Sequence, residues 1–245
     1  MKSLLEVNNL TKNFGGVEAV KNVSFSIVQG SRTGIIGPNG AGKTTLFNVI
    51  AGVFPSTAGK VMFKDEEITN LKPFQICKKG IVRTFQKARV FNSITVEEHV
   101  MMGVVSTKPF FSSEITVEDE EAVKKILILT NMYPYQTKLV KDLTIAQQKK
   151  IGVATALATK PELLLLDEVM AGLDLTEVNK FLKVLYRINE EMGITILIVE
   201  HIMRVIMSLC KKIIVLDNGR KLAEGIPEEI SNNKKVIEAY LGKEA

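Results

Sequence analysis

A glycine-rich segment in the first fifth of the chain carries the clearest chemical signal in this sequence. Residues 37–44 read Gly-Pro-Asn-Gly-Ala-Gly-Lys-Thr and fit the pattern G-x-x-x-x-G-K-[ST] in full. Glycines at positions 37, 40 and 42 let successive backbone N–H groups curl around a β-phosphate without clashes from Cβ atoms. Lys43 would then reach the β- and γ-phosphates, and the Thr44 hydroxyl would be a ligand of Mg²⁺. The residues predicted to hold the triphosphate are Gly37, Pro38, Asn39, Gly40, Ala41, Gly42, Lys43, Thr44 and Thr45.

The elements expected around this segment are the ones that such a loop needs. The apolar run at residues 33–36 predicts a strand, and Leu46, Val49 and Ile50 have the spacing of a helix. A helix that starts there points the positive end of its dipole at the bound anion. The alternative is a glycine turn of purely structural purpose, and the Lys-Thr pair with both flanking elements argues against it.

A second group of candidate residues follows a later apolar run. Residues 163–166 are all leucine and lead directly into Asp167 and Glu168. Because adjacent residues at a strand end face opposite ways, Asp167 can hold the water shell of Mg²⁺ while Glu168 orients or deprotonates an attacking water. Strands often end in acidic residues, so this pair is weak by itself. Together with the glycine-rich segment it predicts hydrolysis of a nucleoside triphosphate.

The rest of the chain predicts an α/β fold. Residues 163–166 and 195–199 are continuous apolar runs, as in parallel strands covered on both faces, and a helical stripe lies between them. Alternation at residues 22–27 indicates a half-buried strand, and Asn218-Gly219 indicates a two-residue hairpin turn. Residues 96–157 contain helical patterns and no convincing strand. We therefore expect a helical lobe inserted in an α/β core.

Composition narrows the class of protein. The 245 residues include 32 basic and 27 acidic side chains, and pairs such as Lys149-Lys150 are scattered along the chain, which is typical of a solvated surface. With no tryptophan to stack on bases, this distribution argues against a nucleic-acid partner. Two cysteines without ligand spacing indicate a reducing compartment and exclude a zinc ribbon. Apolar runs are too short to span a bilayer.

With these motifs in this order, the chain resembles the ATP-binding subunits of ABC transporters over nearly its whole length. It is most similar to the ATPases of bacterial branched-chain amino-acid importers. The stretches that carry this resemblance are Arg83-Thr84-Phe85-Gln86, residues 167–173, and the tail from Val199-Glu200-His201 to Gly242. The resemblance implies a P-loop NTPase (RecA-like) core with an N-terminal antiparallel β subdomain and an inserted α-helical subdomain. It divides one domain, 1–245, into a nucleotide-binding core (1–86 and 161–245) and a helical subdomain (roughly 87–160).

The resemblance also assigns roles to single residues. Phe14 takes the aromatic position that stacks on adenine, with Val20 packing nearby, and Gln86 is the glutamine that touches Mg²⁺ and the water. His201 matches the switch histidine that contacts the γ-phosphate and holds the water, and Asp174 matches a loop that communicates across a dimer. A single ring or histidine is weak on its own, but His201 directly follows a predicted strand, which favours a functional role.

One motif departs from the family pattern. Family members carry a Leu-Ser-Gly-Gly-Gln signature whose serine and glycine N–H groups bind the γ-phosphate held by the opposite subunit. This chain reads Leu143-Thr144-Ile145-Ala146-Gln147. We expect the Cβ of Ala146 to obstruct the approach of the backbone to phosphate, or to exclude a positive φ that glycine would allow. The usual arginine later in the signature helix is also missing, with Thr155 near its place, and Val169 replaces the common proline after Glu168.

These observations predict the ATP-hydrolysing subunit of an ABC importer, with ATP as substrate and Mg²⁺ as cofactor. The resemblance implies a head-to-tail dimer with a second ABC ATPase, identical or different, on transmembrane permease subunits at the cytoplasmic face of the membrane. A short helix of a permease would enter a groove near residues 86–91. A periplasmic or extracellular solute-binding protein would take part indirectly, and the solute stays undefined.

Two alternatives stay open at this point. The first is an ABC-type ATPase that acts on nucleic acid or the ribosome, which the single phosphate-binding motif and the lack of a long heptad stretch disfavour. The second is an ATP-binding regulator that has lost hydrolysis, which Ala146 motivates. A kinase or GTPase is least favoured because no Asn-Lys-x-Asp motif is present.

Overall fold

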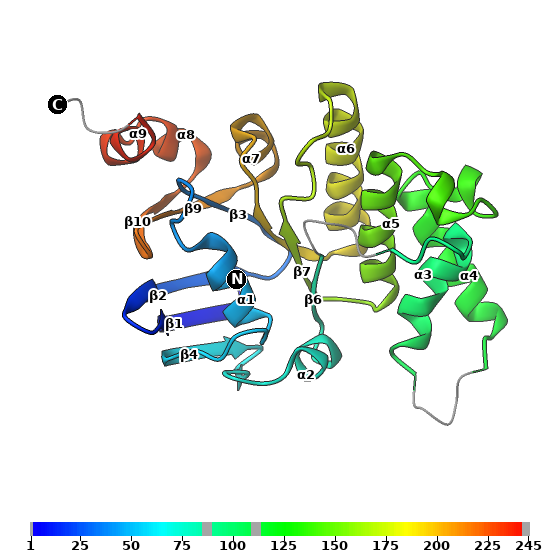
Figure 1. The fold of residues 1–245 in the computed structure, drawn as a ribbon, viewed down its shortest axis with the longest axis horizontal. Coiled ribbons are helices and arrows are strands. Elements are labelled where there is room, and N and C mark those ends of the chain that lie inside the picture. The colour runs from blue at the N-terminus through cyan, green and yellow to red at the C-terminus, as the bar shows by residue number, and fades with distance from the viewer. Residues whose placement is uncertain (1, 85–89, 109–113, 242–245) are drawn as a thin grey trace. The chain divides into compact units, whose positions relative to one another are not determined.

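The computed structural model describes residues 2–84, 90–108 and 114–241 (Figure 1). The chain forms two compact units, one made of residues 1–76 and 195–245 and the other of residues 77–194. We call them the first and the second unit. Within the described ranges, no helix combines the length and the apolar character that a membrane span requires.

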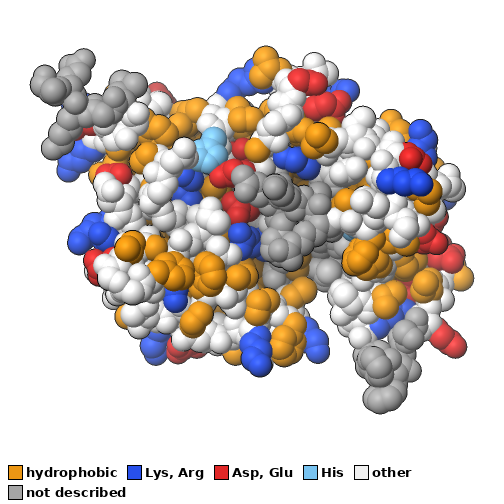
Figure 2. Space-filling view, in the orientation of Figure 1, with side chains coloured by type: hydrophobic (Ala, Val, Ile, Leu, Met, Phe, Trp, Pro, Cys, Tyr) orange, Lys and Arg blue, Asp and Glu red, His pale blue; other side chains and the backbone are white. Residues whose placement is uncertain are grey.

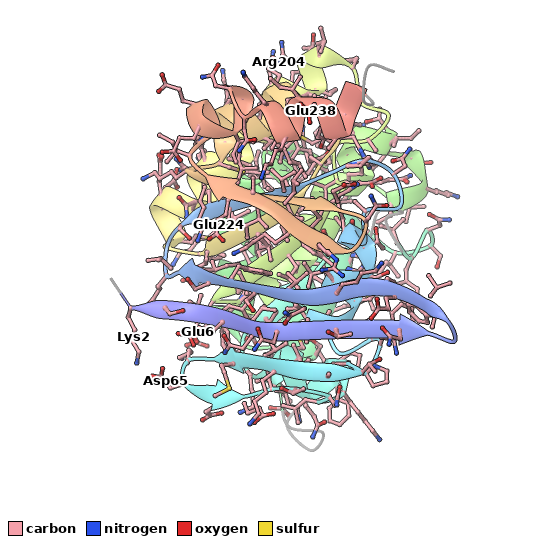
Figure 3. The ribbon with its side chains drawn as sticks, turned by 90° about the vertical axis from the view of Figure 1, so that its left-hand side faces the viewer. Lys2, Glu6, Asp65, Arg204, Glu224 and Glu238 are labelled. Atoms are coloured by element: carbon pink, nitrogen blue, oxygen red, sulfur yellow. The ribbon has the colours of Figure 1, made fainter. Side chains whose placement is uncertain are left out.

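An antiparallel sheet forms the N-terminal part of the first unit. Its strands are β1 (Ser3–Phe14), β2 (Val17–Val28), β4 (Ala58–Phe63) and β5 (Glu66–Glu67), in the order β2-β1-β4-β5. The alternation predicted for residues 22–27 is confirmed, because Val23, Phe25 and Ile27 are buried while the residues between them are more exposed. Figure 3 shows this sheet with Lys2 and Asp65, whose charged groups lie 2.9 Å apart, at one end of its strands.

Parallel strands form the other sheet of the first unit. Strand β3 (Arg32–Ile36) pairs in parallel with β8 (Thr195–Val199) and with β9 (Lys212–Asp217). All residues of β3 and β8 are buried, as expected for strands covered on both faces. The predicted hairpin joins β9 to β10 (Arg220–Gly225), and its central residues Asn218 and Gly219 both have positive φ, as a type I′ turn requires.

Short helices complete the first unit. They are α1 (Lys43–Ile50), α7 (Met203–Leu209), α8 (Pro227–Ser231) and α9 (Lys234–Leu241), and α2 (Pro73–Lys78) leads into the second unit. Helix α7 packs closely on β3: a Cβ at Gly34 would lie 3.0 Å from the Cys210 sulfur and 3.1 Å from a methyl of Ile206. The apolar spacing of these helices in the sequence thus corresponds to the faces that they bury.

The second unit contains one strand pair and several helices. Strand β6 (Ile81–Arg83) pairs in parallel with β7 (Leu163–Asp167). The helices are α3 (Val96–Val105), α4 (Val117–Leu129), α5 (Ile145–Ala158) and α6 (Leu175–Met192), with 3₁₀ turns at Tyr133–Tyr135 and Val140–Asp142. The predicted α/β core with an inserted helical lobe is confirmed, while the residue boundaries predicted for its subdomains stay a prediction.

Threonine caps fix where three of these helices begin. Thr95, Thr116 and Thr144 each accept a hydrogen bond from the backbone N–H three residues later, and the side chain at that position bonds back to the threonine N–H. Such reciprocal capping satisfies two backbone donors that a helix start otherwise leaves unpaired. The caps are encoded locally, so these helix starts follow from the sequence alone.

Helices α3 and α5 pack closely against each other at Gly103. A Cβ on Gly103 would lie 2.4 Å from the carbonyl oxygen of Thr155 and 2.8 Å from the Cβ of Ala158. We expect Gly103→Ala to destabilise the protein by about 1–3 kcal/mol, because the two helices would have to separate. Urea unfolding measures this change in the free energy of unfolding.

Gly152→Ala on α5 is the matched control. Apart from the chain neighbours of Gly152 and the adjacent backbone of α5, no heavy atom of the described residues lies within 4 Å of the Cβ that this substitution would add. Alanine has the higher helix propensity, so we expect Gly152→Ala to be neutral or to stabilise by up to about 1 kcal/mol. Equal effects at the two glycines would contradict the close packing of α3 on α5.

Candidate nucleotide site

The glycine-rich segment connects β3 to α1 in the first unit, and we call residues 37–45 the phosphate loop. Gly37, Gly40 and Gly42 have φ values of 152°, 80° and 97°. A Cβ at Gly37 would lie 2.1 Å from the carbonyl oxygen of Leu216, and one at Gly42 would lie 2.3 Å from that of Ala19. These two glycines are therefore required by the backbone that surrounds the loop. Gly40 is exposed and supplies a loop conformation open to a ligand.

Lys43 is the first residue of α1 and lies under the loop. Its side chain is buried, and its ammonium group donates hydrogen bonds to the carbonyl oxygens of Gly37 (2.7 Å) and Pro38 (2.9 Å). Gly42 precedes the helix and has no side chain to cap it, while Thr44 is exposed and Thr45 half-buried. The start of α1 thus combines backbone N–H donors with a lysine and an accessible hydroxyl, an arrangement that suits a phosphate group.

Phe14 presents a ring to solvent at the end of β1. The side chain is 43% exposed, and its ring packs edge-on against Phe54 with 5.2 Å between centroids. The ammonium group of Lys12 lies 4.8 Å from the ring centroid, whereas Val20 is fully buried. Figure 2 shows further hydrophobic side chains at the surface over the antiparallel sheet. A supported and exposed ring suits the predicted stacking on adenine, which stays a prediction.

His201 lies at the same sheet edge as the phosphate loop. Ile35 of β3 pairs with Val199 of β8, and the two strands run in parallel. The phosphate loop starts two residues after Ile35, and the exposed His201 stands two residues after Val199. Ligands of open α/β sheets bind at the carboxyl ends of the strands. The sheet register therefore brings His201 and the loop to one edge of the sheet.

The second unit holds Asp167 and Glu168 at the end of β7. Asp167 is buried, and its Oδ2 accepts a hydrogen bond of 2.6 Å from a terminal guanidinium nitrogen of Arg83 on β6. Glu168 lies past the strand with a φ of 50°, a left-handed conformation that costs about 1–2 kcal/mol in a residue with a Cβ. A strained turn, and not strand alternation as we expected from the sequence, thus sets the direction of Glu168.

The signature segment begins helix α5. Thr144 caps the helix: its Oγ1 accepts from the N–H of Gln147 (3.3 Å), and the Gln147 side chain accepts from the N–H of Thr144 (2.9 Å). Ala146 lies inside the helix and is only 6% exposed, so its methyl group faces the protein interior and needs no positive φ. Ala146 thus has a helical backbone in this subunit, and the expected obstruction of a phosphate by its Cβ stays a prediction. Ile145, 67% exposed, is the residue that presents bulk at the helix start.

Two lysines of α5 hold the loop that follows Glu168. Lys149 donates to the carbonyl oxygen of Ala171 at 2.6 Å, and the ammonium of the buried Lys150 lies 3.3 Å from Oε2 of Glu177. The N–H of Glu177 bonds to Oδ1 of Asp174, the exposed cap of α6 (2.9 Å). The interpretation of Lys149-Lys150 as solvated surface is therefore wrong. Only the fold shows that both ammonium groups point inward.

The lysines around Glu177 also affect its protonation. A hydrogen bond from Lys180, followed by the charge of Lys150, holds the pKa of Glu177 below its usual value. Sequence reasoning named Asp174 but missed both lysines and the partner role of Arg83. Gln86, the remaining predicted site residue, lies outside the described residues, as does the start of the predicted groove at 86–91.

Comparisons with known proteins place the chain in a family. The family model described as ABC transporter matches residues 20–171. The chain is 35% identical over 99% of both chains to a protein of Pseudomonas aeruginosa named high-affinity branched-chain amino acid transport ATP-binding protein BraF. It belongs to the ABC transporter ATP-binding proteins. It is also 34% identical to LivG of Escherichia coli, a protein with the same descriptive name, over 98% of each chain.

Solved structures support this membership of the ABC ATPases. The ADP conformation of MJ1267, an ATP-binding cassette of an ABC transporter, superposes with a TM-score of 0.90 at 30% identity and covers 99% of this chain and 100% of that one. A nucleotide-free cassette from an ABC transporter gives 0.87 at 32% identity, with the same coverage. A second family model, described as branched-chain amino acid ATP-binding cassette transporter, matches residues 220–245. The fold of this ABC ATPase is thus that of a P-loop NTPase.

The phosphate loop gives a direct test of nucleotide binding. We expect Lys43→Ala to weaken ATP binding at least about tenfold, because the triphosphate would lose a charge-assisted donor. Calorimetric titration with ATP in the presence of magnesium measures the effect. Lys60→Ala is the control, since Lys60 forms an exposed ion pair with Glu67 on the antiparallel sheet. Wild-type affinity in Lys43→Ala would show that the loop does not hold the nucleotide.

Proposed function

We propose that this ABC ATPase hydrolyses ATP as a subunit of an importer for branched-chain or related amino acids. The observation that carries the proposal is the phosphate loop, whose glycines, buried lysine and helix start form a cradle for a triphosphate. The curated relatives are named for transport of branched-chain amino acids. The match of the C-terminal family model adds support for this class of solute. ATP is the substrate that the family implies.

Magnesium fits the oxygen donors of these residues. Thr44 offers an exposed hydroxyl in the first turn of α1, and Asp167 offers a buried carboxylate at the end of β7. Hydroxyl and carboxylate oxygens are the ligands that Mg²⁺ takes beside phosphate. When bound, the cation would neutralise charge that develops on the β- and γ-phosphates. Thr44 would hold it directly, Asp167 through water, and Gln86 is the further ligand that the family pattern adds.

Glu168 and His201 would carry out the chemistry on the water. Glu168 would accept the proton of the water that attacks the γ-phosphorus, and its strained turn fixes the direction of its carboxylate. His201, after β8, would hold the same water and contact the γ-phosphate. Phe14, with Val20 below it, would stack on adenine. Water is the nucleophile in this scheme, so no protein side chain has to attack the phosphorus.

The adjoining ATPase subunit would complete the site. Helix α5 offers backbone N–H groups and the Thr144 hydroxyl to the γ-phosphate of the ATP held by that subunit, and Asp174 would relay closure across the dimer. The Ala146 side chain is buried, so its methyl group does not add bulk to the exposed surface of the signature segment. This weakens the alternative of a regulator without hydrolysis. A dimer with a different ATPase subunit is also compatible with the structure, because the exposed side chain of Ile145 lies where that subunit would dock.

The membrane partners follow from the transporter class. ATP binding would close two ATPase subunits head to tail, hydrolysis would reopen them, and the motion would pass to transmembrane permease subunits. In an importer, a solute-binding protein outside the membrane delivers the amino acid. This ABC ATPase would act on the other side, bound peripherally to the permease subunits at the cytoplasmic face. The alternative of an ATPase that acts on nucleic acid or the ribosome is not favoured by the curated relatives, which are transport proteins.

Glu168→Gln tests the hydrolytic role. We expect the rate of ATP hydrolysis to fall at least about 100-fold, because the amide cannot accept the proton of the water, while ATP binding persists. Single-turnover hydrolysis and calorimetric binding measure the two properties separately. Glu121→Gln, an exposed residue of α4, should leave both unchanged. Unaltered turnover in Glu168→Gln would show that another group acts as the base.

A further inference from the structure

The side chains of Arg83 and Asp167 meet across the strand pair β6–β7. Arg83 pairs in register with Leu165, and Asp167 lies two residues further along β7. Because side chains alternate along a strand, Leu165 and Asp167 share one face, and the Arg83 side chain reaches the carboxylate diagonally. The terminal guanidinium nitrogen lies 2.6 Å from Oδ2 of Asp167. The strand register therefore places the arginine against the carboxylate.

This ion pair is shielded from water. The side chains of Arg83 and Asp167 are 10% and 5% exposed. A buried charge without a partner is costly, so each member of such a pair strongly constrains the other. The chain is also held directly after Arg83, because the N–H of Thr84 donates to the carbonyl oxygen of Leu165 at 2.9 Å. The arginine thus stands on a fixed part of the backbone.

We propose that Arg83 is a positioning residue that holds the Asp167 carboxylate in place and competes with Mg²⁺ for it. The proposal rests on the proposed function, in which Asp167 binds the water shell of the nucleotide-bound metal. Without metal, the guanidinium balances the carboxylate charge. When Mg²⁺ arrives with ATP, two cations share one carboxylate, so the arginine lowers the apparent affinity for the metal.

Loss of the arginine charge has two opposite consequences. The uncompensated Asp167 carboxylate repels a metal-free triphosphate, so ATP should bind more weakly in the absence of magnesium. The same carboxylate attracts the divalent cation more strongly, so less magnesium should be needed to restore binding. A purely structural role for Arg83 would weaken binding under both conditions together. The contrast between the two conditions is therefore the signature of the proposal.

The experiment compares wild type and Arg83→Gln in the full chain. Calorimetry measures ATP affinity with a chelator present and then over a magnesium titration. In Arg83→Gln, we expect the affinity for ATP without metal to fall about threefold to tenfold. The magnesium concentration that gives half of the maximal increase in ATP affinity should fall by a similar factor. An unchanged or higher magnesium requirement in Arg83→Gln would overturn the proposal.

Two further variants control for charge and for pairing. Arg83→Lys keeps the positive charge, so its magnesium requirement should return towards that of wild type. Arg187→Gln removes an arginine that pairs with Glu191 on the exposed side of α6 (2.7 Å), and it should leave the magnesium requirement unchanged. A shift in Arg187→Gln as large as that in Arg83→Gln would show a general effect of net charge and would overturn the specific role of Arg83.

A double-mutant comparison covers the case in which Arg83→Gln fails to fold. Asp167→Asn removes the carboxylate, and the double variant Arg83→Gln/Asp167→Asn leaves no uncompensated charge behind. If Arg83 acts through Asp167, Asp167→Asn and the double variant should need the same magnesium concentration to bind ATP. A further shift in the double variant would overturn the proposal. If ATP binding by the wild type does not depend on magnesium, the proposed metal site itself is contradicted. This result distinguishes a failure of the proposed function from a failure of the role proposed for Arg83.

Discussion

The whole site depends on one backbone constraint, the tight passage of the chain from β3 into α1. Two glycines allow that passage, because Cβ atoms at Gly37 and Gly42 would strike the carbonyl oxygens of Leu216 and Ala19. Those carbonyls belong to β9 and β2, so both sheets of the first unit fix the loop. A loop confined in this way keeps its N–H groups directed at one place, which a flexible glycine segment could not do.

Buried charge organises the second unit in a comparable way. Arg83 meets Asp167, and Lys150 meets Glu177, in pairs that are largely withdrawn from solvent. Such pairs add little net stability because desolvation offsets much of their attraction, but removal of one partner leaves a costly buried charge. Together with the bond from Lys149 to Ala171, they hold the loop after Glu168 and the start of α5 in one arrangement. Residues of two predicted motifs, the acidic pair after β7 and the signature segment, are thus linked within this unit.

The signature segment shows how local rules and tertiary context combine. Thr144 caps the start of α5 through a reciprocal hydrogen-bond pair, and the residues that follow it are helical. Packing then decides which side chain turns inward: Ala146 is buried and Ile145 is exposed. The substitution that looked most damaging in the sequence therefore lies on the protected side. Its exposed neighbour is the residue that an adjoining subunit would meet.

Local sequence rules by themselves determined the phosphate loop, the Asn218-Gly219 hairpin, the buried strands and the threonine caps, because each depends on residues close together in the chain. They also placed Asp167, Glu168 and His201 at strand ends, where chemistry is expected. Only the tertiary structure decided that Arg83 faces Asp167, that the Lys149-Lys150 pair points inward, and that a left-handed turn directs Glu168. Those features arise from strand register and helix packing between segments far apart in sequence, and no local pattern encodes such contacts.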